Sequence, residues 1–206
     1  MTVRAVIFDI GNVLIRWHPE AYYEARFGPD HSATFFREVD IHSVMNRIDA
    51  GAHFGDTLED AARENPGWST EIRALRDNWT DIAQPAIDGS VRLLHALKSA
   101  GVPVFALSNF GAQNFPLSEA QFPFLHAFDR RYISGAMGMA KPDPAIYAAV
   151  EADCGFPPET LLFTDDRADN IATARTRGWH THLFETPQGL ANCLTGHELL
   201  SKEQIT

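Results

Sequence analysis

Short, mainly hydrophobic runs recur along the chain, at residues 3–8 (VRAVIF), 102–107 (VPVFAL) and 160–164 (TLLFT). Continuous runs of this kind are typical of strands that are buried on both faces of a parallel sheet. A further strand is expected at residues 179–184 (WHTHLF), directly after a glycine. The pattern therefore predicts four strands, one near the start of the chain and three after residue 100.

Helices are expected between these strands, because residues typical of helix starts and helix ends bracket the segments between them. Aspartate and Asp-Pro pairs favour helix starts, and glycine is frequent just past helix ends. The expected starts are Asp88, Asp143–Pro144 and Ala168, and the expected ends are Gly101, Gly155 and Gly178. Strands that alternate with helices in this way form a parallel sheet through right-handed crossovers, so the fold class is α/β.

The segment 17–85 interrupts this alternation, because it has few strand-like runs and many aromatic residues. Its helix signals are a start at Pro19, another start at Asp30 with an end at Gly51, and a capping box at Thr57 and Asp60. We predict a small helical cap that is inserted after the first strand and has most of the aromatic residues in its core. The predicted division is a core of residues 1–16 and 86–206 and a cap of residues 17–85.

Composition favours a folded protein outside the membrane. The 206 residues are 45% hydrophobic and 21% charged, close to the average globular chain. Charged residues break every hydrophobic run well short of the ~18 residues of a membrane span. The start MTVRAVIFDIGN lacks the features of a signal peptide, so we expect a cytoplasmic protein. A monomer and a homodimer are both compatible with the sequence.

The net charge is −10, from 17 Lys and Arg against 27 Asp and Glu, and there is no basic stripe. We therefore do not expect nucleic acid as a partner. An acidic protein that binds a small phosphate must do so with a few local donors or with a metal ion.

Polar residues follow the predicted strands where each strand ends. They are Asp9, the pair Ser108–Asn109 and the pair Asp165–Asp166, and Lys141 precedes a predicted helix start. Ligands of open parallel sheets bind at the carboxyl ends of the strands. Adjacent carboxylates at such an edge repel each other unless a cation compensates them.

These groups together suit the transfer of a phosphoryl group. A carboxylate such as Asp9 can attack phosphorus and form an acyl phosphate that water then cleaves. The phosphoryl charge needs donors and cations, which Ser108, the Asn109 amide and Lys141 can supply. Mg²⁺ prefers carboxylate and carbonyl oxygens, which Asp9, Asp166 and the backbone at Gly11 can offer.

Four segments, in order, resemble the motifs of the haloacid dehalogenase (HAD) superfamily of hydrolases: AVIFDIGNVL, LSN, KPDP and LLFTDDRADN. The stretches GNVLIRWHP and FPLSEAQFPFL are further similar to a phosphatase-like subgroup with a small helical cap. The resemblance covers nearly the whole chain and implies a Rossmann-like parallel sheet flanked by helices, with Mg²⁺ as cofactor and a small phosphorylated metabolite as partner.

By this resemblance, Asp9 is the nucleophile, Ser108 and Lys141 hold the phosphoryl group, and the amide of Asn109 joins them. Asp166 is a direct metal ligand, and Asp165 acts on the metal through water. Gly11 and Asn12, which follow the nucleophile, belong to the phosphate-binding and metal-binding segment.

One position departs from the family pattern. Most phosphatases of the superfamily carry a general acid two residues after the nucleophile, and here that residue is Gly11. Sugar phosphatases with the same Asp-x-Gly-Asn start exist in the family, so activity is still expected, at a lower rate. The candidates for a replacement acid are His18, Asp49 and His53, each of which also has a purely structural interpretation.

The function expected first is a Mg²⁺-dependent phosphatase for a small phosphate monoester, such as a sugar phosphate or a nucleotide. A 2-haloacid dehalogenase is the first alternative, but it needs no cation and generally lacks the acidic pair seen at Asp165–Asp166. The second alternative is a HAD-fold protein that binds metabolites without turnover. The loss of the acid at Gly11 favours it, and the retained nucleophile Asp9 opposes it.

Overall fold

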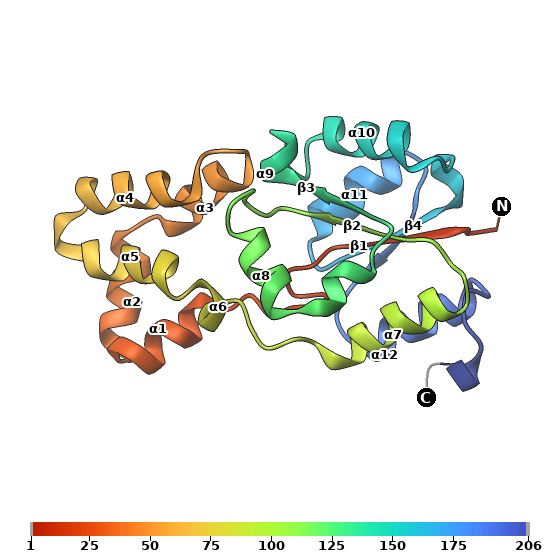
Figure 1. Cartoon of the computed structure of the whole chain (residues 1–206), viewed down its shortest axis with the longest axis horizontal. Helices are drawn as coiled ribbons and strands as arrows, with labels where there is room; N and C mark the ends of the chain where they lie inside the picture. The colour runs from red at the N-terminus through yellow and green to blue at the C-terminus, as the bar shows by residue number, and fades with distance from the viewer. Residues whose placement is uncertain (1, 205–206) are drawn as a thin grey trace.

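The computed structural model describes residues 2–204 and has a five-stranded parallel sheet, with strand order β3-β2-β1-β4-β5 (Figure 1). The strands are β1 (Ala5–Phe8), β2 (Val104–Ser108), β3 (Arg130–Ile133), β4 (Leu161–Asp165) and β5 (His180–Leu183). The order places β1 at the centre, between β2 and β4. The expected α/β class is confirmed, and all four strands predicted from the sequence are present.

The alternation of side chains along the central strands builds two separate hydrophobic layers. Val6 and Phe8 of β1 belong to the core cluster that contains the buried leucines of α7 and α12. Ala5 and Ile7 of the same strand belong to the cluster that contains the buried residues of α10 and α11. Because successive strand residues point to opposite faces, four consecutive apolar residues serve both layers.

The flanking helices cover the two faces of this sheet (Figure 1). One face carries α7 (Asp88–Ser99) and α12 (Pro187–Gly196), and the other carries α10 (Pro144–Cys154) and α11 (Ala168–Thr176). The shorter helices are α8 (Phe115–Gln121), α9 (Ser134–Met137) and the 3-10 turns Pro66–Trp68, Pro123–Ala127, Pro158–Thr160 and Lys202–Gln204. Asp143 caps α10 by accepting a hydrogen bond from the amide of Ala145, as the Asp-Pro signal predicts.

The segment between β1 and α7 forms six helices that lie beyond the carboxyl edge of the sheet (Figure 1). They are α1 (Pro19–Phe27), α2 (Pro29–Glu38), α3 (Ile41–Asp49), α4 (Phe54–Glu64), α5 (Ser69–Asp77) and α6 (Trp79–Ile82). Tyr23 stacks on Phe35 with ring centroids 5.1 Å apart and an interplanar angle of 7°, so aromatic packing forms part of this bundle's core. We call this segment the cap; its status as a separate domain stays a prediction.

Three details differ from the sequence-based predictions. The edge strand β3 was not predicted, because its first two residues, Arg130 and Arg131, are exposed and polar. The stretch from Asp30 to Gly51 forms two helices instead of one. The capping box is wrong: α4 begins at Phe54, so Thr57 and Asp60 lie inside the helix.

The true N-cap of α4 is His53, whose Nδ1 accepts a hydrogen bond from the amide of Asp56. Similarly, Asp88 lies in the first turn of α7 and makes no capping hydrogen bond. Within the described residues, no helix is long and apolar enough to cross a membrane.

Gly135, in α9, lies against the loop that follows β2. A Cβ atom added at Gly135 would lie 2.6 Å from the amide nitrogen of Ala112 and 2.8 Å from the carbonyl oxygen of Phe110. Those atoms are backbone and cannot rotate away. The close approach therefore holds the β2 loop, which follows Ser108 and Asn109, against the start of α9.

We predict that Gly135→Ala lowers the free energy of unfolding by about 1–3 kcal/mol, because the added methyl group forces the backbone apart. Gly196→Ala, in α12, is the matched control: nothing lies within 4 Å of its added Cβ. The control should leave stability unchanged or raise it by ~0.5 kcal/mol. Chemical denaturation measures both, and equal stability of the two variants would contradict the packing argument.

Candidate active site

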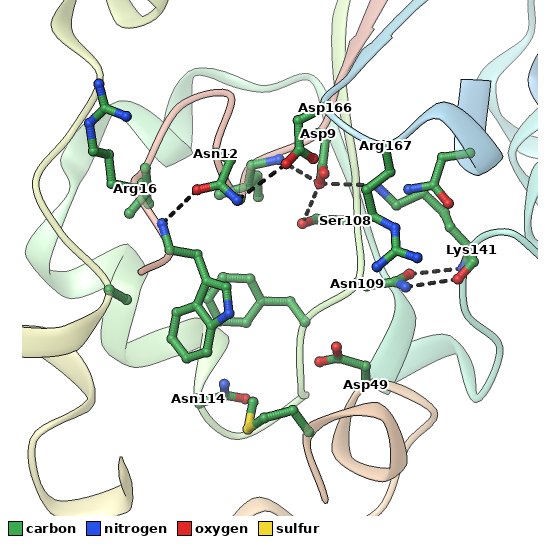
Figure 2. Close-up of a pocket in the computed structure, with 18 of the residues that line it drawn as sticks. Asp9, Asn12, Arg16, Asp49, Ser108, Asn109, Asn114, Lys141, Asp166 and Arg167 are labelled. Carbon is green, nitrogen blue, oxygen red and sulfur yellow. Dashed lines mark hydrogen bonds and ion pairs between the residues drawn. The ribbon is translucent and has the colours of Figure 1, made fainter. Parts of the chain in front are cut away.

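The carboxyl ends of β1, β2 and β4 and the cap helix α3 border one pocket of about 310 Å³ (Figure 2). Most of the residues singled out from the sequence line it, namely Asp9, Gly11, Asn12, Ser108, Asn109, Lys141 and Asp166. Asp165 is buried behind the pocket wall and does not line it. The parallel topology therefore brings together groups that are up to 157 positions apart, from Asp9 to Asp166.

Asp9 follows β1 and has one carboxylate oxygen that is fully engaged. Its Oδ1 accepts hydrogen bonds from the Ser108 hydroxyl at 2.7 Å and from the Ile10 amide at 2.7 Å, and lies 3.0 Å from Lys141 Nζ. Its Oδ2 has no hydrogen-bond partner among residues 2–204. Burial raises the pKa of Asp9 to about 7, because Lys141 and Ser108 offset only part of the desolvation.

Lys141 is the buried cation of the site. Its Nζ donates to the carbonyl of Leu107 at 2.8 Å and to Asp165 Oδ2 at 2.7 Å, besides its ion pair with Asp9. Burial alone would lower the pKa of Lys141, but Asp9 and Asp165 together raise it, so the ammonium stays charged. All three N–H groups of the ammonium thus have partners within the protein.

Asn109 fixes the backbone at Lys141. Its side-chain Nδ2 donates to the Lys141 carbonyl at 2.8 Å, and its Oδ1 accepts from the Lys141 amide at 2.8 Å (Figure 2). This paired contact holds the loop before α10 against the end of β2. The Asn109 side chain therefore positions Lys141. The backbone amide of Asn109 takes no part in this contact.

The neighbouring carboxylates Asp165 and Asp166 have different surroundings. Asp165 is fully buried and accepts from Lys141, from the Arg167 amide at 2.8 Å and from Asn170 Nδ2 at 3.0 Å. The helix that follows, α11, has no side-chain cap. The side chain of Asn170 orients the Asp165 carboxylate.

Asp166 is half-buried and lines the pocket. Burial and the adjacent Asp165 both raise its pKa. Its Oδ2 accepts from Asn12 Nδ2 at 3.2 Å, and Asn12 Oδ1 accepts from the Trp17 amide at 2.9 Å. Asn12 has a left-handed backbone (φ 54°), which aims its side chain at these two groups.

Asp9, Asp165 and Asp166 each offer an oxygen within 4.8 Å of the others, and no other such group of metal ligands occurs among the described residues. Hard carboxylate oxygens of this kind suit a divalent cation such as Mg²⁺. Asp165 is fully buried and does not line the pocket, so Asp9 and Asp166 are the two carboxylates of this group that face it.

Gly11 and the three candidate acids lie in different surroundings. An added Cβ at Gly11 would meet nothing within 4 Å, and its backbone is not left-handed, so the space for a larger side chain is open. His18 is exposed and pairs with Glu20 at 3.0 Å, and His53 caps α4. Only Asp49, of these three, lines the pocket.

The other walls of the pocket are formed by residues that were not predicted from the sequence. Trp17 packs against Trp79 at 5.0 Å between ring centroids, and Trp79 packs against Phe110 at 5.4 Å. These rings and Met45 form an apolar wall. Asn114 is fully buried in the pocket lining, and neither atom of its side-chain amide has a hydrogen-bond partner. No local pattern marks these residues, because only the tertiary fold brings them to the site.

An α/β core with a helical insertion after its first strand, and with an acidic pocket between the two, is the architecture of a capped hydrolase. The family comparison gives the same result: the sequence model of the haloacid dehalogenase-like hydrolases matches residues 3–178. The chain belongs to this family, as its four motifs indicate.

Two curated relatives come from Aspergillus. A drimenol cyclase of Aspergillus calidoustus is 24% identical over 94% of this chain, but this chain spans only 36% of that protein. A sesquiterpene phosphatase of Aspergillus oryzae is 26% identical over 97% of both chains.

Two solved structures share the fold. A HAD family enzyme of Bacteroides thetaiotaomicron is 23% identical, covers 90% of this chain and 95% of its own, and gives a TM-score of 0.75. The same enzyme is also known in complex with magnesium and inorganic phosphate. The L-2-haloacid dehalogenase of Xanthobacter autotrophicus is 18% identical, covers 98% of this chain and 86% of its own, and gives a TM-score of 0.63.

We predict that Asp165→Asn lowers the free energy of unfolding by about 3 kcal/mol, because it removes a charged partner of the buried Lys141. Asp166→Asn, the adjacent substitution, is the control: it relieves like-charge repulsion and should change stability by less than ~1 kcal/mol. Urea denaturation of both variants without metal measures this. Equal losses in the two would contradict the separate surroundings described here.

Proposed function

We propose that this protein is a Mg²⁺-dependent phosphatase that hydrolyses a small phosphate monoester through an aspartyl phosphate on Asp9. The observation that carries the proposal is the state of the Asp9 carboxylate. One of its oxygens is held by Ser108, Ile10 and Lys141, and the other has no partner within the described residues. A carboxylate fixed in this way has one oxygen oriented for attack on phosphorus.

In this reaction Asp9 Oδ2 forms a bond to phosphorus while the bond to the alcohol oxygen breaks. The backbone amides of Asn109 and Gly11 are the donors proposed for the phosphoryl oxygens. The Ser108 hydroxyl donates to Asp9 Oδ1 in this structure and joins them when it turns to the phosphoryl group, whereas the Asn12 amide already donates to the carbonyl of Ile15 at 2.7 Å. Lys141 has no free N–H, so it contributes its positive charge rather than a new hydrogen bond. Water then cleaves the acyl phosphate and regenerates Asp9.

The metal proposed for this site is Mg²⁺, held by Asp9, Asp166 and the backbone carbonyl of Gly11. When bound, it neutralises charge on the phosphoryl oxygens and on the carboxylates. The carboxylate chemistry of the pocket supports this choice, as does the magnesium and phosphate complex of the Bacteroides enzyme. Asp165 keeps a supporting role through its ion pair with Lys141, and the water-mediated contact with the metal that the sequence led us to expect stays a prediction.

The leaving group lies on the cap side of the pocket in this proposal. Sugar phosphates and nucleotides remain candidates, but the aromatic wall favours an alcohol with an apolar face. The sesquiterpene phosphatase relative supports the same choice. The unpaired amide of Asn114 is buried in the pocket lining, so a polar group of the substrate can reach it only if neighbouring side chains of the lining move aside.

We expect phosphate release from a panel of sugar phosphates, nucleotides and prenyl phosphates with Mg²⁺, and loss of release with EDTA. Asp9→Asn should reduce turnover ~10³-fold or more, because the nucleophile is gone. Malachite green detection of phosphate measures this. Silence of the folded wild-type protein on the whole panel would contradict the proposal and favour a metabolite-binding protein without turnover.

The same experiment distinguishes a phosphatase from a 2-haloacid dehalogenase. Asp166 faces the pocket, and its carboxylate suits a cation. This argues against a reaction that needs no metal ion. We therefore expect no chloride release from 2-chloropropionate. Release that persists in EDTA would favour the alternative.

Asn114 offers a test of substrate contact. Asn114→Leu keeps a similar volume and removes two unpaired buried polar atoms, so the free energy of unfolding should stay equal or rise by ~1 kcal/mol. If the amide binds substrate, KM should rise ~10-fold in the same variant. Denaturation and steady-state kinetics measure the two effects. A stable variant with unchanged KM would exclude Asn114 from substrate binding.

A further inference from the structure

Asp49 reaches the pocket because of the periodicity of α3. Ile41, Val44 and Ile48 are buried in the hydrophobic core and form the inner face of this helix. The adjacent stripe, at i, i+3, i+4 and i+7, is His42, Met45, Asn46 and Asp49, and all four line the pocket. The last residue of α3 therefore presents its side chain to the site.

The Asp49 carboxyl group has no polar partner within the described residues. It makes no hydrogen bond or ion pair among the residues described, whereas Asp9 is bound by Ser108 and Asp166 by Asn12. Figure 2 shows it on the cap side of the pocket, facing the open space between the cap and the Asp9–Ser108 pair. An unpaired, half-buried carboxyl group in a pocket is available to a ligand.

Burial raises the pKa of Asp49 to about 7, and the charge of Lys141 offsets only part of this effect. Near neutral pH, a substantial fraction of this group therefore carries a proton. The other titratable side chains that line the pocket are Asp9, Arg16, His42, Lys141, Asp166 and Arg167. Helices α4 and α9, which pack against α3, add no side chain to the lining as far as the structure describes it.

The proposed phosphatase reaction needs a proton donor that the segment after Asp9 lacks. When the bond between phosphorus and the alcohol oxygen breaks, an alkoxide leaves unless an acid protonates it. Gly11 has no side chain, and the space around it is open. The remaining candidates, His18 and His53, do not line the pocket.

We propose that Asp49 is the general acid of this protein, supplied by the cap instead of by the residue two positions after the nucleophile. This inference rests on the proposed phosphatase function. As Asp9 Oδ2 bonds to phosphorus, the Asp49 carboxyl group gives its proton to the leaving oxygen, and the alcohol departs neutral. In the second step water attacks the aspartyl phosphate, both of its protons leave with the released dihydrogen phosphate, and the Asp49 carboxylate regains its proton from solvent.

The test compares two esters whose leaving groups differ in their need for an acid. p-Nitrophenol departs readily as an anion, whereas an alkyl alcohol needs a proton. Asp49→Asn should lower kcat for an alkyl phosphate by about 10²–10⁴-fold. The same variant should change kcat for p-nitrophenyl phosphate less than ~10-fold. Equal losses on both esters, or no loss on either, would overturn the proposal.

Two further variants test whether the activity lost in Asp49→Asn is lost because a proton donor is missing. Asp60→Asn, an exposed residue of α4 paired with Arg63, should leave both rates unchanged. Adding Gly11→Asp to the Asp49→Asn protein returns an acid to the open position and should recover at least ~10-fold of the lost alkyl phosphate turnover. No recovery, in a double variant that keeps wild-type turnover of p-nitrophenyl phosphate, would show that the loss was not of a proton donor.

The pH profile gives an independent readout. Because the acid must be protonated, kcat of the wild type for the alkyl ester should fall as pH rises through about 7, and Asp49→Asn should lack this limb. His42→Gln should keep it, which separates Asp49 from the histidine on the same helix face. If the wild type hydrolyses neither ester, the proposed function fails; if only the Asp49→Asn predictions fail, the function stands without this acid.

Discussion

A buried ammonium between two carboxylates sets the geometry on which the rest of the site depends. Removing Lys141 from water is costly unless each N–H has a partner, and the partners come from three different segments: Asp9 after β1, Leu107 in β2 and Asp165 at the end of β4. The ion cluster therefore fixes the relative positions of the central strands where the pocket opens. Asn109 and Asn170 add the hydrogen bonds that hold the lysine backbone and the inner carboxylate.

The same cluster explains how adjacent acidic residues serve different purposes. Asp165 is the last residue of β4 and lies inside the protein, where its charge balances Lys141. Asp166 begins the following loop and faces the pocket, where burial and its neighbour make a lone negative charge unfavourable. A cation relieves that cost, so the structure that stabilises the lysine also creates a position suited to a metal ion.

The sequence predicted most of what short-range patterns control. The hydrophobic runs, the Asp-Pro start of α10 and the polar strand ends led to the sheet and to Asp9, Ser108 and Lys141. The strand β3 was missed because Arg130 and Arg131 belong to an edge and carry no buried pattern. The aromatic wall and Asn114 could not be predicted, because they reach the pocket through tertiary packing alone. Asp49 was one of three candidates that only the fold could separate, since His18 and His53 look equally suitable in sequence.

A proton donor on α3 would join chemistry and substrate choice in one element. The stripe that ends at Asp49 also contains Met45, which is part of the apolar wall, so the same helix face would contact the leaving group and protonate it. The neighbouring face, with Ile48, is anchored in the hydrophobic core. A substrate that does not fit the wall then also leaves its oxygen misplaced relative to the acid, and it is turned over slowly even when its phosphoryl group binds well. Under this proposal, recognition of the alcohol would act on kcat as well as on KM, although the proposed nucleophile lies on the other side of the pocket.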